Sequence, residues 1–122
     1  MRDSLELLRQ ELVSFAAERD WEQFHTPKNL VMALGGEVGE LTAELQWLTD
    51  DQICAGLADG HLRSRVADEM ADVLIYLVRL ADVCGVDLLS AATAKIQDNG
   101  SRYPVEKSWG NARKYNRSAE ED

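Results

Sequence analysis

Two pairs of carboxylates repeat in the sequence at a helical spacing. Glu37 and Glu40 form an ExxE motif in "GGEVGELTAELQW", and Glu69 and Asp72 form an ExxD motif in "DEMADVLIYL". Residues three apart share one face of a helix. Each segment therefore presents two neighbouring acids. The chain between the two segments is long enough for the helices to turn back and pack antiparallel.

The first acid of each pair interrupts an apolar stripe. Glu37 follows Leu34 by three residues and precedes Leu41 by four, where helical periodicity predicts an apolar side chain. Glu69 interrupts the stripe of its own segment in the same way. Acidic side chains are almost never fully buried unless they are paired or bound to something. The pattern favours a bound ligand, and the alternative is an ordinary solvated surface.

Converging carboxylates require protons or cations between them. Two unit charges about 4 Å apart repel by about 4 kcal/mol at an effective dielectric constant near 20. Oxygen ligands without His or Cys select hard metals, chiefly Mg²⁺, with Mn²⁺ as a possible substitute. We therefore predict a metal site formed by Glu37, Glu40, Glu69 and Asp72.

A short row of phosphate-binding side chains follows later in the chain. Lys95, Asn99 and Arg102 are spaced i, i+4 and i+7, so they lie on one side of a helix that extends that far. Two cations and an amide suit phosphate oxygens. Taken by itself, this row is also consistent with an ordinary salt-bridged surface. Beside an acidic metal site the cations are complementary, because a metal ion neutralises one side of a polyphosphate and cationic side chains hold the other.

Aromatic side chains accompany the acids. Trp47 follows Glu40 by seven residues and Tyr76 follows Glu69 by seven, so each lies two turns beyond its acid. Together with Trp21 they are candidates for stacking on a nucleobase. Ordinary core packing is the alternative for each of them.

The elements that carry these residues are helical. Apolar spacing, the break at Pro27 and the expected caps Asp87 and Gly85 predict four helices. Their approximate ranges are 3–19, 28–48, 61–84 and 87–99. Residues 50–60 are expected to form a short helix or loop, Gly100 to cap the last helix, and the segment beyond it to be extended. No β-alternation persists, so we predict an all-α four-helix bundle whose thin core is completed by a second subunit, as a homo-oligomer.

Composition excludes several function classes. The formal net charge is -9, which argues against general binding to nucleic acid or anionic membranes, although six of the 13 Lys and Arg residues lie between 95 and 117. No uncharged apolar run is long enough to span a membrane. The opening segment predicts an amphipathic helix rather than a targeting peptide. Two cysteines, Cys54 and Cys84, favour reduced thiols and a cytoplasmic location.

In their order along the chain, three segments resemble the all-α nucleotide pyrophosphohydrolase (MazG-like) superfamily, and among its members the dCTP pyrophosphatase branch. They are "ERDWEQFHTPKNLVMALGGEVGELTAELQW", "DEMADVLIYLVRLAD" and "KIQDNGSRYPVEKSWGNARKY". The order ExxE, ExxD and then KxxxNxxRYP is highly specific. The resemblance spans about residues 4–115, and we expect a single domain over 1–116 followed by a flexible tail over 117–122.

The resemblance implies a role for each matching position. The four acids match Mg²⁺ ligands, and the aromatics Trp21, Trp47 and Tyr76 match the walls of a base pocket. The phosphate-binding positions are Lys95, Asn99, Arg102 and Tyr103. Family members form dimers or tetramers. Animal dCTP-preferring members carry a His on the first helix where this chain has Leu12, so the resemblance implies general nucleoside triphosphate pyrophosphohydrolysis more strongly than cytosine preference.

The predicted activity is Mg²⁺-dependent hydrolysis of a nucleoside triphosphate, dCTP or a modified dCTP, to monophosphate and pyrophosphate, which would sanitise the nucleotide pool. Glu40 is the candidate base that orients or deprotonates the attacking water. One alternative is a di-iron carboxylate bundle, but that needs paired ExxH motifs and the sequence has one, from Glu22 to His25. The other is a non-catalytic helical oligomer that binds nucleotides or proteins.

Overall fold

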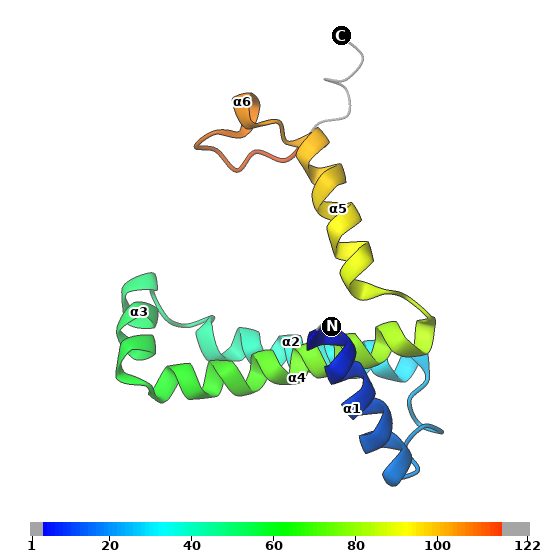
Figure 1. Cartoon of the computed structure of the whole chain (residues 1–122). Coiled ribbons are helices and arrows are strands. Elements are labelled where there is room, and N and C mark those ends of the chain that lie inside the picture. Colours follow the sequence, from blue (N-terminus) through cyan, green and yellow to red (C-terminus); the bar gives the residue numbers. More distant parts are fainter. Residues whose placement is uncertain (1–3, 116–122) are drawn as a thin grey trace. The chain divides into compact units, whose positions relative to one another are not determined.

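The computed structural model describes residues 4–115, and every regular element in that range is a helix (Figure 1). The elements are α1 (Ser4–Glu18), α2 (Pro27–Leu45), α3 (Asp50–Asp59), α4 (His61–Cys84), α5 (Leu88–Arg102) and α6 (Val105–Ser108). The all-α prediction is confirmed. The chain divides into two compact units, Met1–Val86 and Asp87–Asp122, here called the first and second unit.

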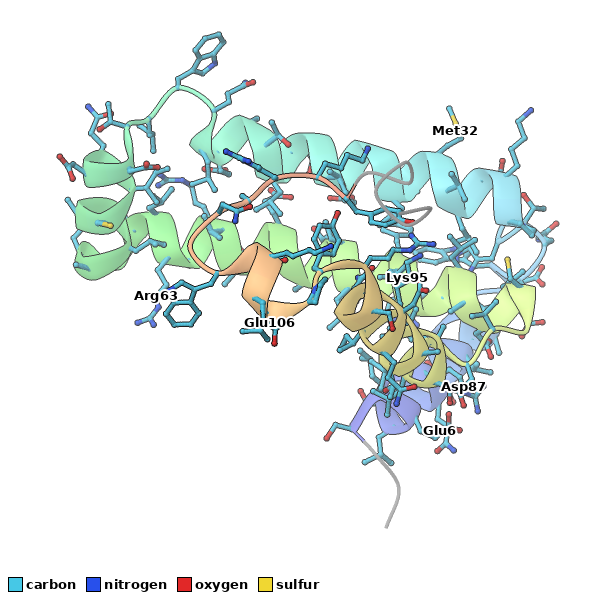
Figure 2. The ribbon with its side chains drawn as sticks, turned by 90° about the horizontal axis from the view of Figure 1, so that it is seen from above. Glu6, Met32, Arg63, Asp87, Lys95 and Glu106 are labelled. Carbon is cyan, nitrogen blue, oxygen red and sulfur yellow. The ribbon has the colours of Figure 1, made fainter. Side chains whose placement is uncertain are left out.

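The first unit is organised around α4. Figure 1 shows α2 and α4 side by side and running in opposite directions, as the acid spacing predicts, and α1 and α3 also pack on α4. The buried apolar side chains described in this unit are few and mostly small: Ala16, Leu30, Leu62, Val78 and Ala81. The expected thin core is thus confirmed. Large apolar side chains remain exposed, such as Met32, which is 69% exposed and projects away from α2 (Figure 2).

Local capping explains where the helices of the first unit begin and end. The Thr26 side chain accepts a hydrogen bond from the Asn29 N–H at 3.2 Å, and Pro27 fills the first helical position of α2. Thr49 and Gln52 form a reciprocal capping box at the start of α3. Gly85, at φ 70°, ends α4 in the left-handed conformation, as predicted.

The second unit confirms one predicted cap and corrects another. Asp87 accepts a hydrogen bond from the Ser90 N–H at 3.0 Å and begins α5. The prediction that Gly100 ends this helix is wrong: α5 continues through Gly100 to Arg102, and the Tyr103 N–H bonds to the Asn99 carbonyl at 2.8 Å. One helical turn, α6, also forms where extended chain was predicted. The predicted tail over 117–122 lies outside the described residues.

Among the described helices, none is both long and apolar enough to cross a bilayer.

Candidate metal and nucleotide site

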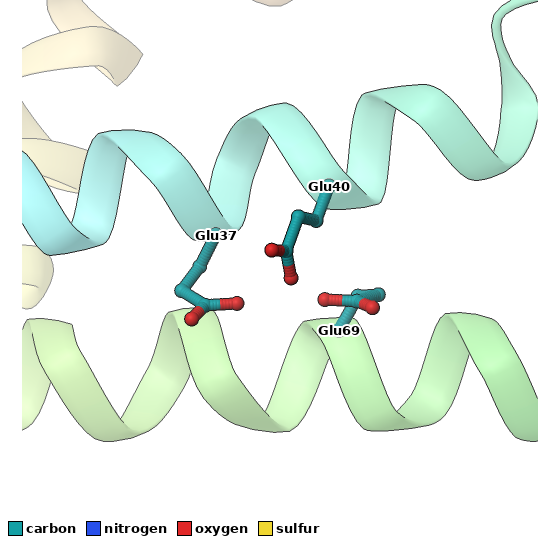
Figure 3. A group of neighbouring side chains, drawn as sticks. All are labelled: Glu37, Glu40 and Glu69. Atoms are coloured by element: carbon teal, nitrogen blue, oxygen red, sulfur yellow. The ribbon is translucent and has the colours of Figure 1, made fainter.

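Three of the four predicted acids converge between α2 and α4. One carboxylate oxygen from each of Glu37, Glu40 and Glu69 lies within 4.8 Å of the other two. Figure 3 shows Glu37 and Glu40 reaching down from α2 and Glu69 reaching up from α4. The spacing within α2 and the antiparallel packing of α4 together produce this convergence.

Burial leaves part of this cluster without partners. The Oε2 atoms of Glu37 and Glu69 are buried, and neither has a hydrogen-bond partner in the described part of the chain. Burial raises the pKa of Glu69 to about 7, and a hydrogen bond and like charge from Glu40 add to the shift. The pKa of Glu37 is raised by the same causes in the same order. The cluster therefore holds its negative charge at a free-energy cost when nothing is bound.

This donor set fits a hard divalent cation. The donors are all carboxylate oxygens, two of them buried and unpartnered, and a cation would offset both the lost hydration and the mutual repulsion. Asp72 is half-buried and lies outside the closest group, yet its charge contributes to the raised pKa values of Glu37 and Glu69. Asp72 is thus near enough to act on the cluster electrostatically, and the metal-binding role of all four acids remains a prediction.

Glu44, a further acid of α2, is engaged elsewhere. Its carboxylate forms an ion pair with the Arg65 guanidinium of α4 at 2.9 Å. This contact ties α2 to the opposite helix beyond the acid cluster. Glu44 therefore acts as a link between the two helices that carry the cluster.

The predicted phosphate-binding residues lie in the second unit. Lys95, Asn99 and Arg102 belong to α5, and Tyr103 is the residue that caps its end. Asp98 lies between the two cations, 3.8 Å from Lys95 and 3.5 Å from Arg102. The roles of these four residues in binding phosphate remain predictions.

The three predicted base-pocket aromatics have different surroundings. Trp21 packs edge-on against Phe15 and His25, with ring centroids 5.7 and 6.3 Å away. Trp47 lies just after α2 and is 85% exposed, whereas Tyr76 is half-buried on α4. Trp21 therefore has ordinary packing partners, while the exposed Trp47 ring is free to stack on a ligand.

A buried ionic network in the first unit was not predicted from the sequence. Arg79 is 8% exposed, and its Nε donates to Nδ1 of His25 at 3.0 Å while its Nη1 donates to Asp82 at 2.9 Å. Asp82 also accepts from Arg9 at 2.8 Å. The sequence signal for this network is the spacing of Arg79 and Asp82, a basic and an acidic residue three positions apart near the end of α4. His25 is thereby engaged away from the acid cluster, so the ExxH motif gives the di-iron alternative no support.

Comparison with known proteins now gives the class. A model of the MazG-like family matches residues 35–117, and the chain belongs to this family. It is 48% identical over 112 residues to dCTP pyrophosphatase 1 of Bos taurus and 47% identical to that of Homo sapiens. These alignments cover 92% of this chain and 66% of each relative, so the chain spans a little under two thirds of their length.

A solved structure agrees in fold. The chain resembles the crystal structure of a pyrophosphatase from Archaeoglobus fulgidus with a TM-score of 0.78 and 35% identity. The match covers 85% of this chain and 95% of the archaeal one. The resemblance to the MazG-like pyrophosphohydrolases, seen in the order of the sequence motifs, is confirmed.

Proposed function

We propose that the protein is a Mg²⁺-dependent pyrophosphohydrolase that converts dCTP or a modified dCTP to the monophosphate and pyrophosphate. The observation that carries the proposal is the convergence of Glu37, Glu40 and Glu69 within 4.8 Å, with two buried oxygens left unpartnered. The similarity to dCTP pyrophosphatase 1 supports the choice of substrate.

The acidic residues have two roles, binding the cation and accepting a proton. Glu37, Glu69 and Asp72 hold the cation with Glu40, and Mn²⁺ can substitute for Mg²⁺. When bound, such a cation neutralises phosphate charge and lowers the pKa of a nearby water. Glu40 accepts a proton from the attacking water, and its exposure, which the other two members of the cluster lack, supports this role. Water adds to phosphorus, and the bond to the leaving pyrophosphate or nucleotide oxygen breaks.

Other predicted residues bind the nucleotide. The aromatic rings of Trp21, Trp47 and Tyr76 contact the base. Its phosphates are bound by Lys95, Asn99, Arg102 and Tyr103. The thin core and the exposed apolar side chains support assembly into a dimer or tetramer, in which neighbouring chains cover the thin core. We further propose that the enzyme sanitises the nucleotide pool of the cytoplasm.

The test is pyrophosphate release from a panel of canonical and 5-substituted dNTPs and NTPs, with and without Mg²⁺. We expect metal-dependent release, with dCTP and its modified forms leading. Glu69→Ala is expected to lower kcat/KM by at least about 100-fold, because even indirect metal partners contribute 10- to 100-fold. Asp68→Ala removes a neighbouring exposed acid of α4 and is the matched control, expected to remain near wild type.

The outcomes separate the remaining interpretations. Equal pyrophosphate release from nucleotides with different bases would support the hydrolysis but not a preference for cytosine. Leu12→His would then be the first variant to test for that preference. Nucleotide binding without turnover in every condition would overturn the proposal in favour of a non-catalytic helical oligomer. Analytical ultracentrifugation of the same preparation decides between dimer and tetramer, and a monomer would overturn the assembly.

A further inference from the structure

A cavity of the second unit gathers positive charge. It has a volume of about 230 Å³ and lies between the end of α5, α6 and the segment up to Tyr115. Four cations line it, Arg102, Lys107, Arg113 and Lys114, and no acidic side chain does. Such a volume corresponds to roughly seven or eight water molecules of liquid. The cavity is therefore large enough for more than a single small ion.

The folded-back segment that closes the cavity is fixed at both ends. The Tyr103 hydroxyl accepts a hydrogen bond from the Tyr115 N–H at 3.1 Å, and the two rings meet edge-on at 6.4 Å. The Arg102 guanidinium lies 5.4 Å from the centre of the Tyr115 ring. These contacts join residues twelve and thirteen positions apart and hold the cationic segment against the end of α5.

The turn between α6 and this segment is also held by specific bonds. The Asn111 amide donates to the Lys107 carbonyl at 3.0 Å and its oxygen accepts from the Arg113 N–H at 3.2 Å. Gly110, at φ 71°, allows the chain to reverse there. The backbones of Lys107 and Arg113 are thus fixed by contacts that do not involve their own side chains.

The charge of the cavity is largely uncompensated. Arg102 shares Asp98 with Lys95, at 3.5 Å. Within residues 4–115, Lys107, Arg113 and Lys114 form no ion pair. Clustering of like charges around one hollow is unfavourable by itself, and a multiply charged anion would offset it. The Tyr103 hydroxyl proton adds a hydrogen-bond donor, because its oxygen is the acceptor for Tyr115.

We propose that this cavity is a binding site for a chain of phosphate groups, and that Lys107, Arg113 and Lys114 are its ligating side chains together with Arg102. Arginine forks and lysine ammonium groups match phosphate oxygens, and no acid in the lining repels them. The phosphate chain has two possible sources with the same chemistry, the phosphates of a nucleotide or free pyrophosphate. The site is argued from its own residues, and only its connection to turnover depends on the proposed function.

The test measures binding of inorganic pyrophosphate to the full chain in EDTA by isothermal titration calorimetry. Without a divalent cation, the acid cluster offers no attraction to phosphate. Lys107→Ala/Arg113→Ala removes one Lys and one Arg from the cavity, and its matched control is Lys28→Ala/Arg63→Ala. Lys28 and Arg63 are exposed residues of α2 and α4, and Figure 2 shows Arg63 pointing away from its helix.

We expect the cavity variant to bind pyrophosphate about tenfold or more weakly, since it loses two side chains that form charge-assisted hydrogen bonds with phosphate oxygens. The control is expected to stay within about twofold, since it loses the same charge but neither Lys28 nor Arg63 lines the cavity. Backbone amide shifts of residues 107–115 on pyrophosphate addition, followed by NMR, should respond in the control and not in the cavity variant. Equal affinity of the two variants, or no binding by wild type, would overturn the site.

Two further arms identify the source of the phosphates and separate this inference from the proposed function. If the cavity takes nucleotide phosphates, Lys107→Ala/Arg113→Ala weakens dCTP as much as pyrophosphate and leaves dCMP less affected; if it takes only free pyrophosphate, dCTP affinity is unchanged. In the Glu69→Ala background, pyrophosphate binding in EDTA should persist. Loss of pyrophosphate binding in Glu69→Ala would overturn the proposal that the cavity is an independent site. Normal pyrophosphate binding by a protein that hydrolyses no nucleotide would overturn only the proposed function.

Discussion

The Nε of Arg79 donates a hydrogen bond to Nδ1 of His25 at 3.0 Å, and this contact joins the end of α4 to the loop before α2. The two residues are 54 positions apart in sequence. The guanidinium also binds Asp82, which in turn accepts from Arg9 of α1. One buried cation therefore holds three separate segments of the first unit together.

Asp82→Ala should lower the free energy of unfolding by about 3–5 kcal/mol, because it leaves the buried Arg79 cation without its compensating charge. Urea denaturation followed by circular dichroism measures the change. Asp68→Ala, which removes an exposed acid of the same helix, should stay within about 0.5 kcal/mol of wild type. A loss of less than about 1 kcal/mol for Asp82→Ala would mean that the network is not structural.

His25 should titrate below its ordinary pKa of 6.5, because burial and then the charge of Arg79 disfavour its protonated form. Arginine only donates, so Nδ1 must be the unprotonated nitrogen and Nε2 must carry the proton. The neutral form therefore stabilises the fold above pH 6.5, and this contribution is lost as the pH falls through the lowered pKa. Nitrogen-15 NMR titration gives both the tautomer and the pKa. In Arg79→Met the pKa should rise but stay below 6.5, and an unchanged pKa would contradict the contribution of Arg79.

Glu69 should give the apoprotein the opposite pH dependence. Its folded pKa of about 7 lies above the ordinary value of 4.5, so its contribution to stability is complete below pH 4.5 and is lost as the pH rises through 7. Denaturation in EDTA across that range should show a smaller decrease in stability for Glu69→Gln than for wild type. Saturating Mg²⁺ should restore the stability that the wild-type protein loses at high pH, because a ligand that binds only the folded state stabilises that state. Identical pH profiles for wild type and Glu69→Gln would contradict the buried-carboxylate interpretation.

Trp47→Ala should weaken nucleotide binding about 5- to 150-fold, which corresponds to about 1–3 kcal/mol for base stacking on an aromatic ring. Its 85% exposed ring has no competing core role. Trp109, which is 84% exposed, is the matched control, and Trp109→Ala should leave dCMP affinity unchanged. Equilibrium dialysis with dCMP reports the base contact without the phosphate chain. Equal affinities for the two variants would exclude Trp47 from the base pocket.

Replacing each of two helical glycines by alanine should change the stability of the protein in opposite directions. A Cβ at Gly56 of α3 would meet Leu62 side-chain carbons at 2.9 and 3.0 Å, whereas a Cβ at Gly36 of α2 would meet nothing within 4 Å. Gly36→Ala should therefore stabilise the protein by about 0.5–1 kcal/mol, and Gly56→Ala should destabilise it by about 1–3 kcal/mol. Thermal unfolding of both variants tests this pair. If Gly36→Ala stabilises the fold but lowers turnover or breaks the oligomer, a ligand or partner helix approaches α2 beside Glu37.

Much of the fold and part of the site followed from short-range features of the sequence. The positions of Glu37 and Glu40 on one face of α2 depend only on helical periodicity, and the end of α4 depends only on a glycine that tolerates a positive φ. The same local rules failed at Gly100, because a glycine permits a helix end without requiring one. The two acidic motifs, followed in order by the cationic one, are by themselves specific enough to indicate the family.

Tertiary packing decided what these residues experience. Only the pairing of α2 with α4 brings Glu69 to Glu37 and Glu40 and removes water from one oxygen each of Glu37 and Glu69, which is the largest cause of their raised pKa values. The contact between Arg79 and His25 and the one between Tyr103 and Tyr115 likewise join residues whose sequence neighbours give no sign of a partner. Sequence spacing determines which face of a helix a side chain occupies; desolvation and long-range contacts depend on what is packed against that face.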